Sequence, residues 1–270
     1  MTQVAIQGEA GSFSHAAALE THGPTLQLVP CSTFEDLFDA VETEAADRGI
    51  VPIENTLAGS VHENYDLLSA HPLHVVGETE LRIRHCLIAS PGTKTRDIAR
   101  VASHPVALAQ CRRFFLEHPN LVAVPAYDTA GSVRDLMAGR GVADAAIASA
   151  LAAELYGAAV LAEGLEDHAE NYTRFLVVAR EPAPPEAASK LSLMFTLTNA
   201  SGVLHRALGV FATRGLDLTK IESRPLPGRP WEYLFYLDVL GDADEVEEAL
   251  DELRAFAPVL RVLGAYPGRS

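Results

Sequence analysis

Apolar residues in the first two thirds of the chain form short continuous runs separated by stretches with helical spacing. The short runs are typical of buried strands, and the stretches between them are typical of amphipathic helices. The predicted strands are 4–7, 26–29, 50–53, two between 73 and 89, 101–103, 121–125, 145–148 and 174–179, and the predicted helices are 14–21, 105–117, 129–138 and 149–155. This alternation indicates an α/β fold with helices covering parallel sheets.

Polar residues mark the start of one further predicted helix. Apolar side chains from Phe34 to Val41 recur at i, i+3, i+4 and i+7. Ser32 and Glu35 have the spacing of a capping box, in which each side chain bonds the backbone N–H of the other residue. The sequence therefore predicts a helix that begins beside Ser32 and ends before Gly49.

A proline-rich stretch divides the chain into two parts. Residues 181–189 contain three prolines, two acids and no large apolar residue, which is typical of a semi-rigid linker between 1–180 and 190–270. The second part reads as βαββαβ, with strands 191–198, 216–222, 232–240 and 259–263, helices 203–213 and 244–256, and a proline-rich connection at 225–230. This order predicts a ferredoxin-like domain. One face of its sheet would be left uncovered by helices, and self-association is the simplest way to cover it.

Composition narrows the possible partners. The net charge of −15 lacks the basic footprint that nucleic acid or an anionic membrane surface requires, so neither is expected as a partner. The three widely spaced cysteines form no CxxC motif and indicate reduced, buried thiols. The chain enters a strand pattern at once, without a secretory signal pattern, so we expect a cytoplasmic protein.

Small and hydrogen-bonding residues gather where predicted strands lead into helices. In α/β sheets these junctions line the carboxyl edge, where ligands bind and where helix N-termini suit carboxylates. Any one junction is explained equally well as a helix cap, but five together favour a binding site. The junctions are 8–12, 54–56, 103–105, 128–129 and 149.

Several kinds of chemistry have no support in the sequence. The turn at 8–11 lacks the glycine pattern of a dinucleotide or phosphate loop, and no HExxH, Cys/His cluster or GxSxG motif occurs. We therefore expect no cofactor and no metal site.

Five polar segments stand at or near these junctions, namely 8–14, Val-Pro-Ile-Glu-Asn-Thr and the residues after it at 51–61, 103–111, 128–131, and Asn-Tyr-Thr-Arg-Phe at 171–175. Together they resemble the signature segments of the prephenate dehydratase family. After the linker, 202–208 and 222–225 are similar to the two phenylalanine-binding segments of the family's regulatory ACT domain. The match covers nearly the whole chain in the family's order, and leaves no room for the chorismate mutase domain of some relatives.

The resemblance implies both a fold and an activity. The fold would be a bilobal catalytic domain like that of periplasmic binding proteins, with the site in its cleft, followed by a ferredoxin-like βαββαβ ACT domain. The activity would be conversion of prephenate to phenylpyruvate, water and carbon dioxide in L-phenylalanine biosynthesis, without a cofactor. L-phenylalanine would be a feedback effector, and the protein would be a homodimer or homotetramer.

Two adjacent residues are expected to lead the chemistry. We expect Thr173 to donate a hydrogen bond to the departing hydroxyl group and Arg174 to bind a substrate carboxylate, both facing one crevice with Asn55. A strand-entry threonine and an inter-lobe salt bridge are the ordinary alternatives for the two residues.

Other residues are assigned catalytic or substrate-binding roles with their own alternatives. Asn55 and Gln110 can orient polar oxygens without adding charge, or serve as loop bonds. Glu54 is either a proton source or the partner of an arginine, and pairing is favoured. The expected substrate-binding residues are Gly11, Ser12, Ser103, Thr129, Asn171 and Phe175.

The ACT resemblance supplies the expected effector site. Gly202 at a helix start would let backbone N–H groups meet an amino-acid carboxylate, although a plain turn glycine is the alternative. Val203 departs from the family's usual alanine. The expected effector-binding residues are Gly202, Val203, Leu204, Glu222, Ser223, Arg224 and Pro225.

Two other functions fit the same sequence. Arogenate differs from prephenate only in an amino group in place of a keto group, and the sequence does not distinguish these substrates. A non-catalytic small-molecule binding protein is also consistent with a bilobal α/β cleft.

Overall fold

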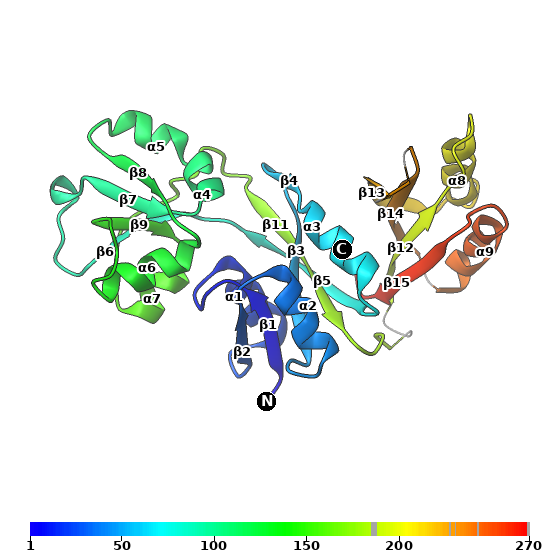
Figure 1. The fold of residues 1–270 in the computed structure, drawn as a ribbon, viewed down its shortest axis with the longest axis horizontal. Coiled ribbons are helices and arrows are strands. Elements are labelled where there is room, and N and C mark those ends of the chain that lie inside the picture. Colours follow the sequence, from blue (N-terminus) through cyan, green and yellow to red (C-terminus); the bar gives the residue numbers. More distant parts are fainter. Residues whose placement is uncertain (185–187, 227, 230, 242, 269–270) are drawn as a thin grey trace. The chain divides into compact units, whose positions relative to one another are not determined.

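The computed structural model describes residues 1–184, 188–226, 228–229, 231–241 and 243–268, with backbone alone for 243 and 244. The predicted linker 181–189 and the connection 225–230 therefore lie partly outside the described residues. The chain forms two compact units, Met1–Asn64 with Thr79–Phe175, and Tyr65–Glu78 with Leu176–Ser270. Three elements run from one unit into the other, namely α3 (His62–Ala70), β5 (His74–Arg82) and β11 (Tyr172–Ala179) (Figure 1).

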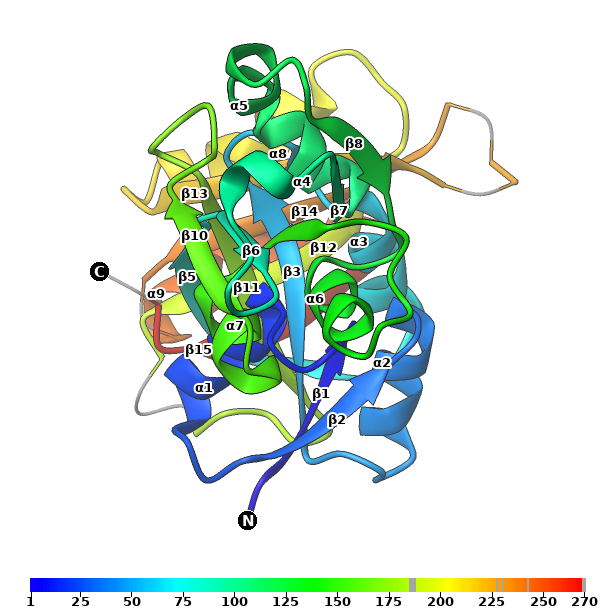
Figure 2. The same cartoon turned by 90° about the vertical axis from the view of Figure 1, so that its left-hand side faces the viewer.

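The strands of the described residues form three sheets. The first has the order β2-β1-β3-β11-β5, with β4 paired to β3, and β1 runs parallel to both of its neighbours. In Figure 2 these neighbours, β2 and β3, lie on either side of β1. The other elements are β1 (Gln3–Gln7), β2 (Gln27–Cys31), β3 (Arg48–Asn55), β4 (Gly59–Ser60), α1 (Phe13–His22) and α2 (Phe34–Glu42).

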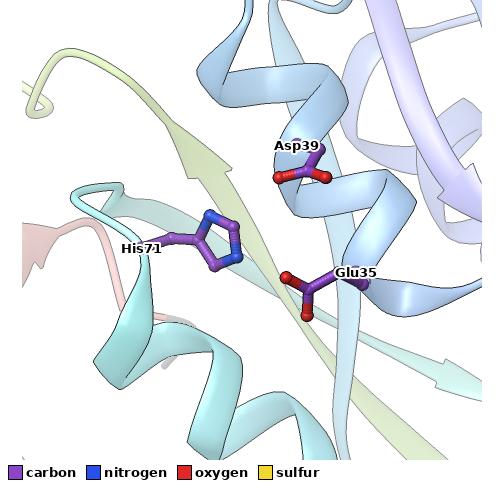
Figure 3. A group of neighbouring side chains, drawn as sticks. All are labelled: Glu35, Asp39 and His71. Carbon is purple, nitrogen blue, oxygen red and sulfur yellow. The ribbon is translucent and has the colours of Figure 1, made fainter.

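The start of α2 differs by one residue from the prediction. The N-cap is Thr33, whose hydroxyl accepts from the Asp36 N–H at 3.1 Å, while the Asp36 carboxylate accepts from the Thr33 N–H at 3.0 Å. The predicted Ser32–Glu35 box is therefore wrong, because the same spacing recurs one position later and only the later pair lies at the helix end. Glu35 instead projects from α2 one turn before Asp39 (Figure 3, which also labels His71 of the second unit).

The second sheet has the order β10-β6-β9-β7-β8. Its strands are β6 (Cys86–Ala89), β7 (Arg100–Ser103), β8 (Val122–Pro125), β9 (Ala145–Ala148) and β10 (Ala159–Glu163), and the helical elements are η1 (Thr95–Asp97), α4 (Pro105–Gln110), α5 (Arg112–Glu117), α6 (Thr129–Met137) and α7 (Ala150–Tyr156). The helix predicted at 105–117 is thus two short helices that meet at Cys111. In Figure 1, α4 and α5 lie on one side of the second sheet, and α6 and α7 lie on the other.

The third sheet belongs to the second unit and has the order β13-β14-β12-β15, with every pair antiparallel. Its elements are β12 (Lys190–Thr196), α8 (Val203–Ala212), β13 (Asp217–Pro225), β14 (Tyr233–Leu240), α9 (Ala243–Arg254) and β15 (Leu260–Tyr266). Buried side chains such as Leu193, Phe195 and Phe211 form the core between sheet and helices. The predicted βαββαβ order and the α/β fold class are confirmed. No helix among the described residues is both long and apolar enough to cross a bilayer.

An arginine closes the end of α3 within the second unit. The Arg261 guanidinium on β15 donates to the carbonyl oxygens of Leu68, Ser69, His71 and Leu73 at 2.7–3.4 Å. Carbonyls in the last turn of a helix have no partner within the helix, so an external cation satisfies them and complements the helix dipole.

We expect Arg261→Met to lower the free energy of unfolding by about 1.5–3 kcal/mol, because hydrogen bonds from a charged donor are lost. Urea denaturation followed by circular dichroism measures the change. The exposed Arg112→Met serves as the control and is expected to stay within about 0.5 kcal/mol of the parent. Equal effects of the two substitutions would contradict the capping role of Arg261.

Candidate active site

The first unit contains a cavity of about 430 Å³ that is lined by strands β3, β4 and β11 of the first sheet, by helices α1, α4 and α6, and by connecting residues. Its polar lining comprises Ser14, Asn55, Ser60, His85, His104, Gln110, Thr129 and Thr173, and large apolar lining residues are Phe13, Ile83, Val106 and Phe175. A small cavity with apolar walls and a few convergent polar groups is the usual form of a small-molecule site.

Three carboxamides form a closed ring at one side of the cavity. Asn55 Nδ2 donates to Asn171 Oδ1 at 2.8 Å, Asn171 Nδ2 donates to Gln110 Oε1 at 3.1 Å, and Gln110 Nε2 lies 3.4 Å from Asn55 Oδ1. Backbone N–H groups of Leu57 and Ala58 also donate to Asn55 Oδ1, at 3.0 and 2.8 Å. The ring joins three segments that are far apart in the chain.

The hydroxyl group of Thr173 is oriented by this ring. The two protons of Asn55 Nδ2 are shared among three acceptors, which are Asn171 Oδ1 and, at 3.0 Å each, Thr173 Oγ1 and the Tyr172 carbonyl oxygen. Since the hydroxyl oxygen accepts from the amide, its own proton remains available to a ligand in the cavity. Thr173 therefore lies where a donor to a bound hydroxyl group is needed.

His85 is a cavity residue that the sequence analysis missed. It follows β5, is only 2% exposed, and its Nε2 lies 2.8 Å from Gln110 Oε1. Its ring meets that of Phe13 edge to face, with centroids 5.4 Å apart. Burial lowers the pKa of His85, which keeps the ring neutral at pH 7. No motif surrounds this residue, so only its place between the two sheets reveals it.

Thr173 and Arg174 do not face the same crevice. Thr173 and Phe175 line the cavity, whereas Tyr172 and Arg174 line a separate hollow of about 230 Å³. Successive side chains of a strand point to opposite faces, so neighbours on β11 cannot share one site. The expected pairing of Thr173 with Arg174 in one crevice is wrong, and the position of Arg174 gives no support to its predicted role there.

The same alternation separates Glu54 from Asn55 on β3. Glu54 lines the hollow that contains Arg174 and Glu80, while Asn55 lines the cavity. A carboxylate on the far face of the strand does not meet a ligand in the cavity. This placement favours pairing over proton donation as the interpretation of Glu54.

The predicted substrate-binding residues fall into two groups. Thr129 at the start of α6 and Phe175 on β11 line the cavity, and Asn171 lies behind it in the amide ring. Ser12 and Ser103 are not among the lining residues.

The two serines have structural bonds of their own. The Ser12 hydroxyl caps α1 by accepting from the His15 N–H at 3.2 Å. The Ser103 hydroxyl is fully buried and donates to the Ile147 carbonyl oxygen at 2.6 Å, between neighbouring elements of the second sheet.

Gly11 brings the backbones of two helical regions together. It has a φ of +89°, and a Cβ atom there would lie 2.8 Å from Ala152 Cα on α7. The Ser149 hydroxyl donates to the Gly11 carbonyl oxygen, and the Tyr156 hydroxyl donates to the Ala10 carbonyl oxygen at 2.9 Å. Gly11 is outside the cavity lining, and its position is explained by this close approach.

Helix ends supply positive potential at the cavity. No lysine or arginine occurs among the described lining residues. Phe13 and Ser14 stand at the start of α1, and Thr129 stands at the start of α6, where the dipoles favour anions. The His104 Nδ1 accepts from the Val106 N–H at 3.3 Å, so the neutral ring carries its proton on Nε2.

The second unit has a hollow of about 220 Å³ at the start of α8. Gly202 is the N-cap of α8, with a φ of +79°, and Gly202, Val203 and Leu204 all line the hollow. Trp231 in the turn before β14, and Tyr233 and Phe235 on β14, line it too and were missed, because aromatic residues on or beside a strand are usually interpreted as packing residues.

The other predicted effector residues lie elsewhere. Glu222, Ser223, Arg224 and Pro225 on β13 are not among the lining residues of that hollow. The Arg224 guanidinium instead bonds both carboxylate oxygens of Asp66 on α3, at 3.1 and 2.7 Å. Their effector-binding role remains a prediction, and in this arrangement Arg224 connects β13 to α3.

The family follows from comparison with known proteins. Residues 4–183 match the family model of prephenate dehydratase, and residues 191–258 match that of the ACT domain. The chain belongs to the prephenate dehydratase family. Prephenate dehydratase is a lyase, so the predicted enzyme class and the predicted ACT domain are confirmed.

Two curated plant proteins illustrate the sequence relationship. The chain is 46% identical to arogenate dehydratase/prephenate dehydratase 2, chloroplastic, of Arabidopsis thaliana, over 98% of this chain and 72% of the relative. It is also 46% identical to arogenate dehydratase 2 of Petunia hybrida, over 99% of this chain and 72% of the relative.

Two solved structures share the fold across nearly the whole chain. One is prephenate dehydratase from Arthrobacter aurescens in complex with L-Phe, with 34% identity, a TM-score of 0.90 and coverage of 99% of this chain and 90% of that one. The other is described as GqqA, a novel type of quorum quenching acylase, with 37% identity, a TM-score of 0.89 and coverage of 99% and 98%.

We expect Asn171→Leu to lower the free energy of unfolding by about 1–3 kcal/mol, because the fully buried amide both donates and accepts within the ring. Urea denaturation measures the loss. Asn120→Leu at an exposed position is the control and is expected to change stability by less than about 0.5 kcal/mol. A loss no larger than that of the control would contradict the structural role of the ring.

Proposed function

We propose that this enzyme converts prephenate to phenylpyruvate, carbon dioxide and water. The observation that carries the proposal is the Thr173 hydroxyl, which accepts from Asn55 and so can donate into the cavity. Among the described residues, the hydrogen bond of Thr173 Oγ1 is to Asn55 and not to an imidazole or a carboxylate. A threonine without a neighbouring base is poorly suited to nucleophilic acyl transfer, but it suits hydrogen-bond donation to a leaving group.

In this reaction a carboxylate and a hydroxyl group leave from opposite ends of the substrate ring, and the enzyme must stabilise both departures. The bond between the ring and its carboxylate breaks, and its electron pair enters the ring as carbon dioxide leaves. The opposite C–O bond breaks at the same time, and the departing hydroxide takes up one proton to become water. The product ring is aromatic, which supplies the driving force, and Thr173 stabilises the negative charge that develops on the departing oxygen.

The cavity lining matches the two ends of this substrate. The starts of α1 and α6 and the His104 Nε2–H can bind carboxylate oxygens without a cationic side chain. The apolar side chains of Phe13, Val106 and Phe175 offer poor solvation to a carboxylate, which favours its loss as neutral carbon dioxide.

Thr173→Val is expected to lower kcat by about 10²–10³, because a preorganised donor to the leaving group is lost while the side-chain shape is kept. Phenylpyruvate formation from prephenate measures the change, and circular dichroism checks the fold. The exposed Thr95→Val is the control and should turn over like the parent. A Thr173→Val enzyme with turnover near that of the parent would refute the assigned role.

Arogenate is the second candidate substrate. It is favoured by the two plant relatives whose names include arogenate dehydratase. Its reaction gives phenylalanine directly by the same bond changes. Assaying both substrates with the same preparation, and comparing kcat/KM, decides between them.

We further propose that L-phenylalanine inhibits the enzyme by binding at the start of α8. The support is the hollow bordered by Gly202, Val203 and Leu204, together with the L-Phe complex of the related Arthrobacter aurescens enzyme. The exposed N–H groups of a helix start suit the effector carboxylate, and Phe235 and Tyr233 offer aromatic contact to its ring.

Trp231 provides a direct test because it is the single tryptophan of the chain and lines this hollow. We expect L-phenylalanine to change its fluorescence saturably, at the concentrations that inhibit turnover, whereas L-alanine should have little effect. Gly202→Val should weaken both responses, since its φ of +79° strains any branched residue. Inhibition without any fluorescence change would place the effector elsewhere.

We also propose that the protein is cytoplasmic and that it forms a homodimer or a homotetramer. Cys31, Cys86 and Cys111 are all free and buried, which agrees with a reducing compartment. Ile221, Trp231 and Tyr233 expose apolar surface on β13, β14 and the turn between them, which supports contact with a second copy.

A further inference from the structure

His85 and Gln110 are held together by one strap, the segment Leu165–Asp167. The Leu165 N–H donates to the His85 carbonyl oxygen at 3.1 Å, and the His85 N–H donates to the Glu166 carboxylate at 2.9 Å. The Asp167 N–H donates to the Gln110 carbonyl oxygen at 2.7 Å. The strap thus fixes the main chain of both residues, and their side chains meet at 2.8 Å.

The direction of every hydrogen bond in the amide ring can be deduced from the backbone. Asn55 Oδ1 faces the N–H groups of Leu57 and Ala58, and Asn55 Nδ2 faces the Tyr172 carbonyl oxygen. A backbone N–H can only donate and a carbonyl can only accept, so the orientation of the Asn55 amide is determined at both ends.

The deduction continues around the ring to His85. Since Asn55 Nδ2 donates to Asn171 Oδ1, the amide nitrogen of Asn171 is the atom that faces Gln110, and the Gln110 atom that receives it is the carbonyl oxygen. An oxygen cannot donate, so His85 Nε2 must carry the proton in the bond to Gln110 Oε1. The neutral ring then has its lone pair on Nδ1, which is buried and has no hydrogen-bond partner among the described residues.

The Nδ1 atom itself is closed to solvent, so its lack of a partner does not mark a ligand contact. What the ring gives the site is a donor of fixed direction. Turning the Gln110 amide over would place its NH₂ group against the N–H of His85 and the NH₂ of Asn171, and its oxygen against Asn55 Oδ1. Each of these contacts is repulsive, so His85 penalises the wrong orientation of Gln110.

We propose that His85, as the neutral Nε2–H tautomer, is a positioning residue that locks the Gln110 amide with its NH₂ group toward Asn55, the residue that bonds Thr173 at the cavity. The chain of bonds runs from His85 to Gln110, then to Asn55, then to Thr173. The proposal about turnover rests on the proposed function of Thr173, whereas the tautomer follows from the bonds alone.

The tautomer is tested first, on the unaltered full-length protein. Two-bond ¹H–¹⁵N correlation spectra of histidine side chains distinguish Nε2–H, Nδ1–H and doubly protonated rings, and comparison with His85→Gln assigns the signal. We expect Nε2–H at neutral pH. An Nδ1–H ring or an imidazolium would overturn the proposal, whatever reaction the enzyme catalyses.

The kinetic test uses a cycle of substitutions. His85→Leu should lower kcat about threefold to tenfold, because one neutral hydrogen bond shifts an equilibrium between two amide orientations by about that factor. KM should change less than about twofold, because Nε2 of His85 is engaged by Gln110 and Nδ1 is closed to solvent, which leaves no polar atom of the ring for the substrate. His85→Gln, whose amide nitrogen can replace Nε2, should recover most of the lost kcat.

The second arm of the cycle separates positioning from a general effect on the fold. In a Gln110→Met background there is no amide to orient, so adding His85→Leu should lower kcat no further. The same fall in both backgrounds, or no fall in the parent, would overturn the proposal. Thermal unfolding of each variant accompanies the assay. If His85→Leu does not fold, the spectrum of the unaltered protein still decides.

Discussion

The orientation of one buried amide determines much of the site. The backbone N–H groups of Leu57 and Ala58 leave the Asn55 amide a single orientation, and the carboxamides of Asn171 and Gln110 must follow it. Buried polar networks stabilise a fold only when each member is satisfied, and this ring achieves that with neutral groups. By donating to the Thr173 oxygen, Asn55 leaves the hydroxyl proton of Thr173 available to a ligand, and every bond within the ring joins neutral groups.

Much of the architecture could be predicted because it depends on local periodicity. The βαββαβ order of the second unit follows from apolar spacing and turn residues alone, and its bounds move by a few residues at most. Predictions failed where the local structure depends on contacts that the sequence pattern does not show. Strand β10 was not predicted, because its half-exposed residues form a strand by pairing with β6. Thr33, not Ser32, is the N-cap of α2, because the helix begins one residue later than predicted.

Only part of the candidate site could be predicted from the sequence. Motifs identified Asn55, Gln110 and Thr173, which the structure brings together from three distant segments. Adjacent motif residues such as Arg174 were expected in the same place, but the alternation of a strand sends them to the other face. His85 lies in no motif, and its importance comes from a contact with a residue 25 positions away, which a sequence alone does not reveal.

The close approach at Gly11 bears on how a ligand could enter. Main chain meets main chain there, and hydroxyl groups of Ser149 and Tyr156 tie the loop before α1 to α7. At Gly11 itself no side chain lies between the two backbones that could adjust during a rotation. If the two sheets move apart to widen the cavity, the rotation must therefore have its hinge at Gly11. Otherwise the movement must break the hydrogen bonds of Ser149 and Tyr156 together.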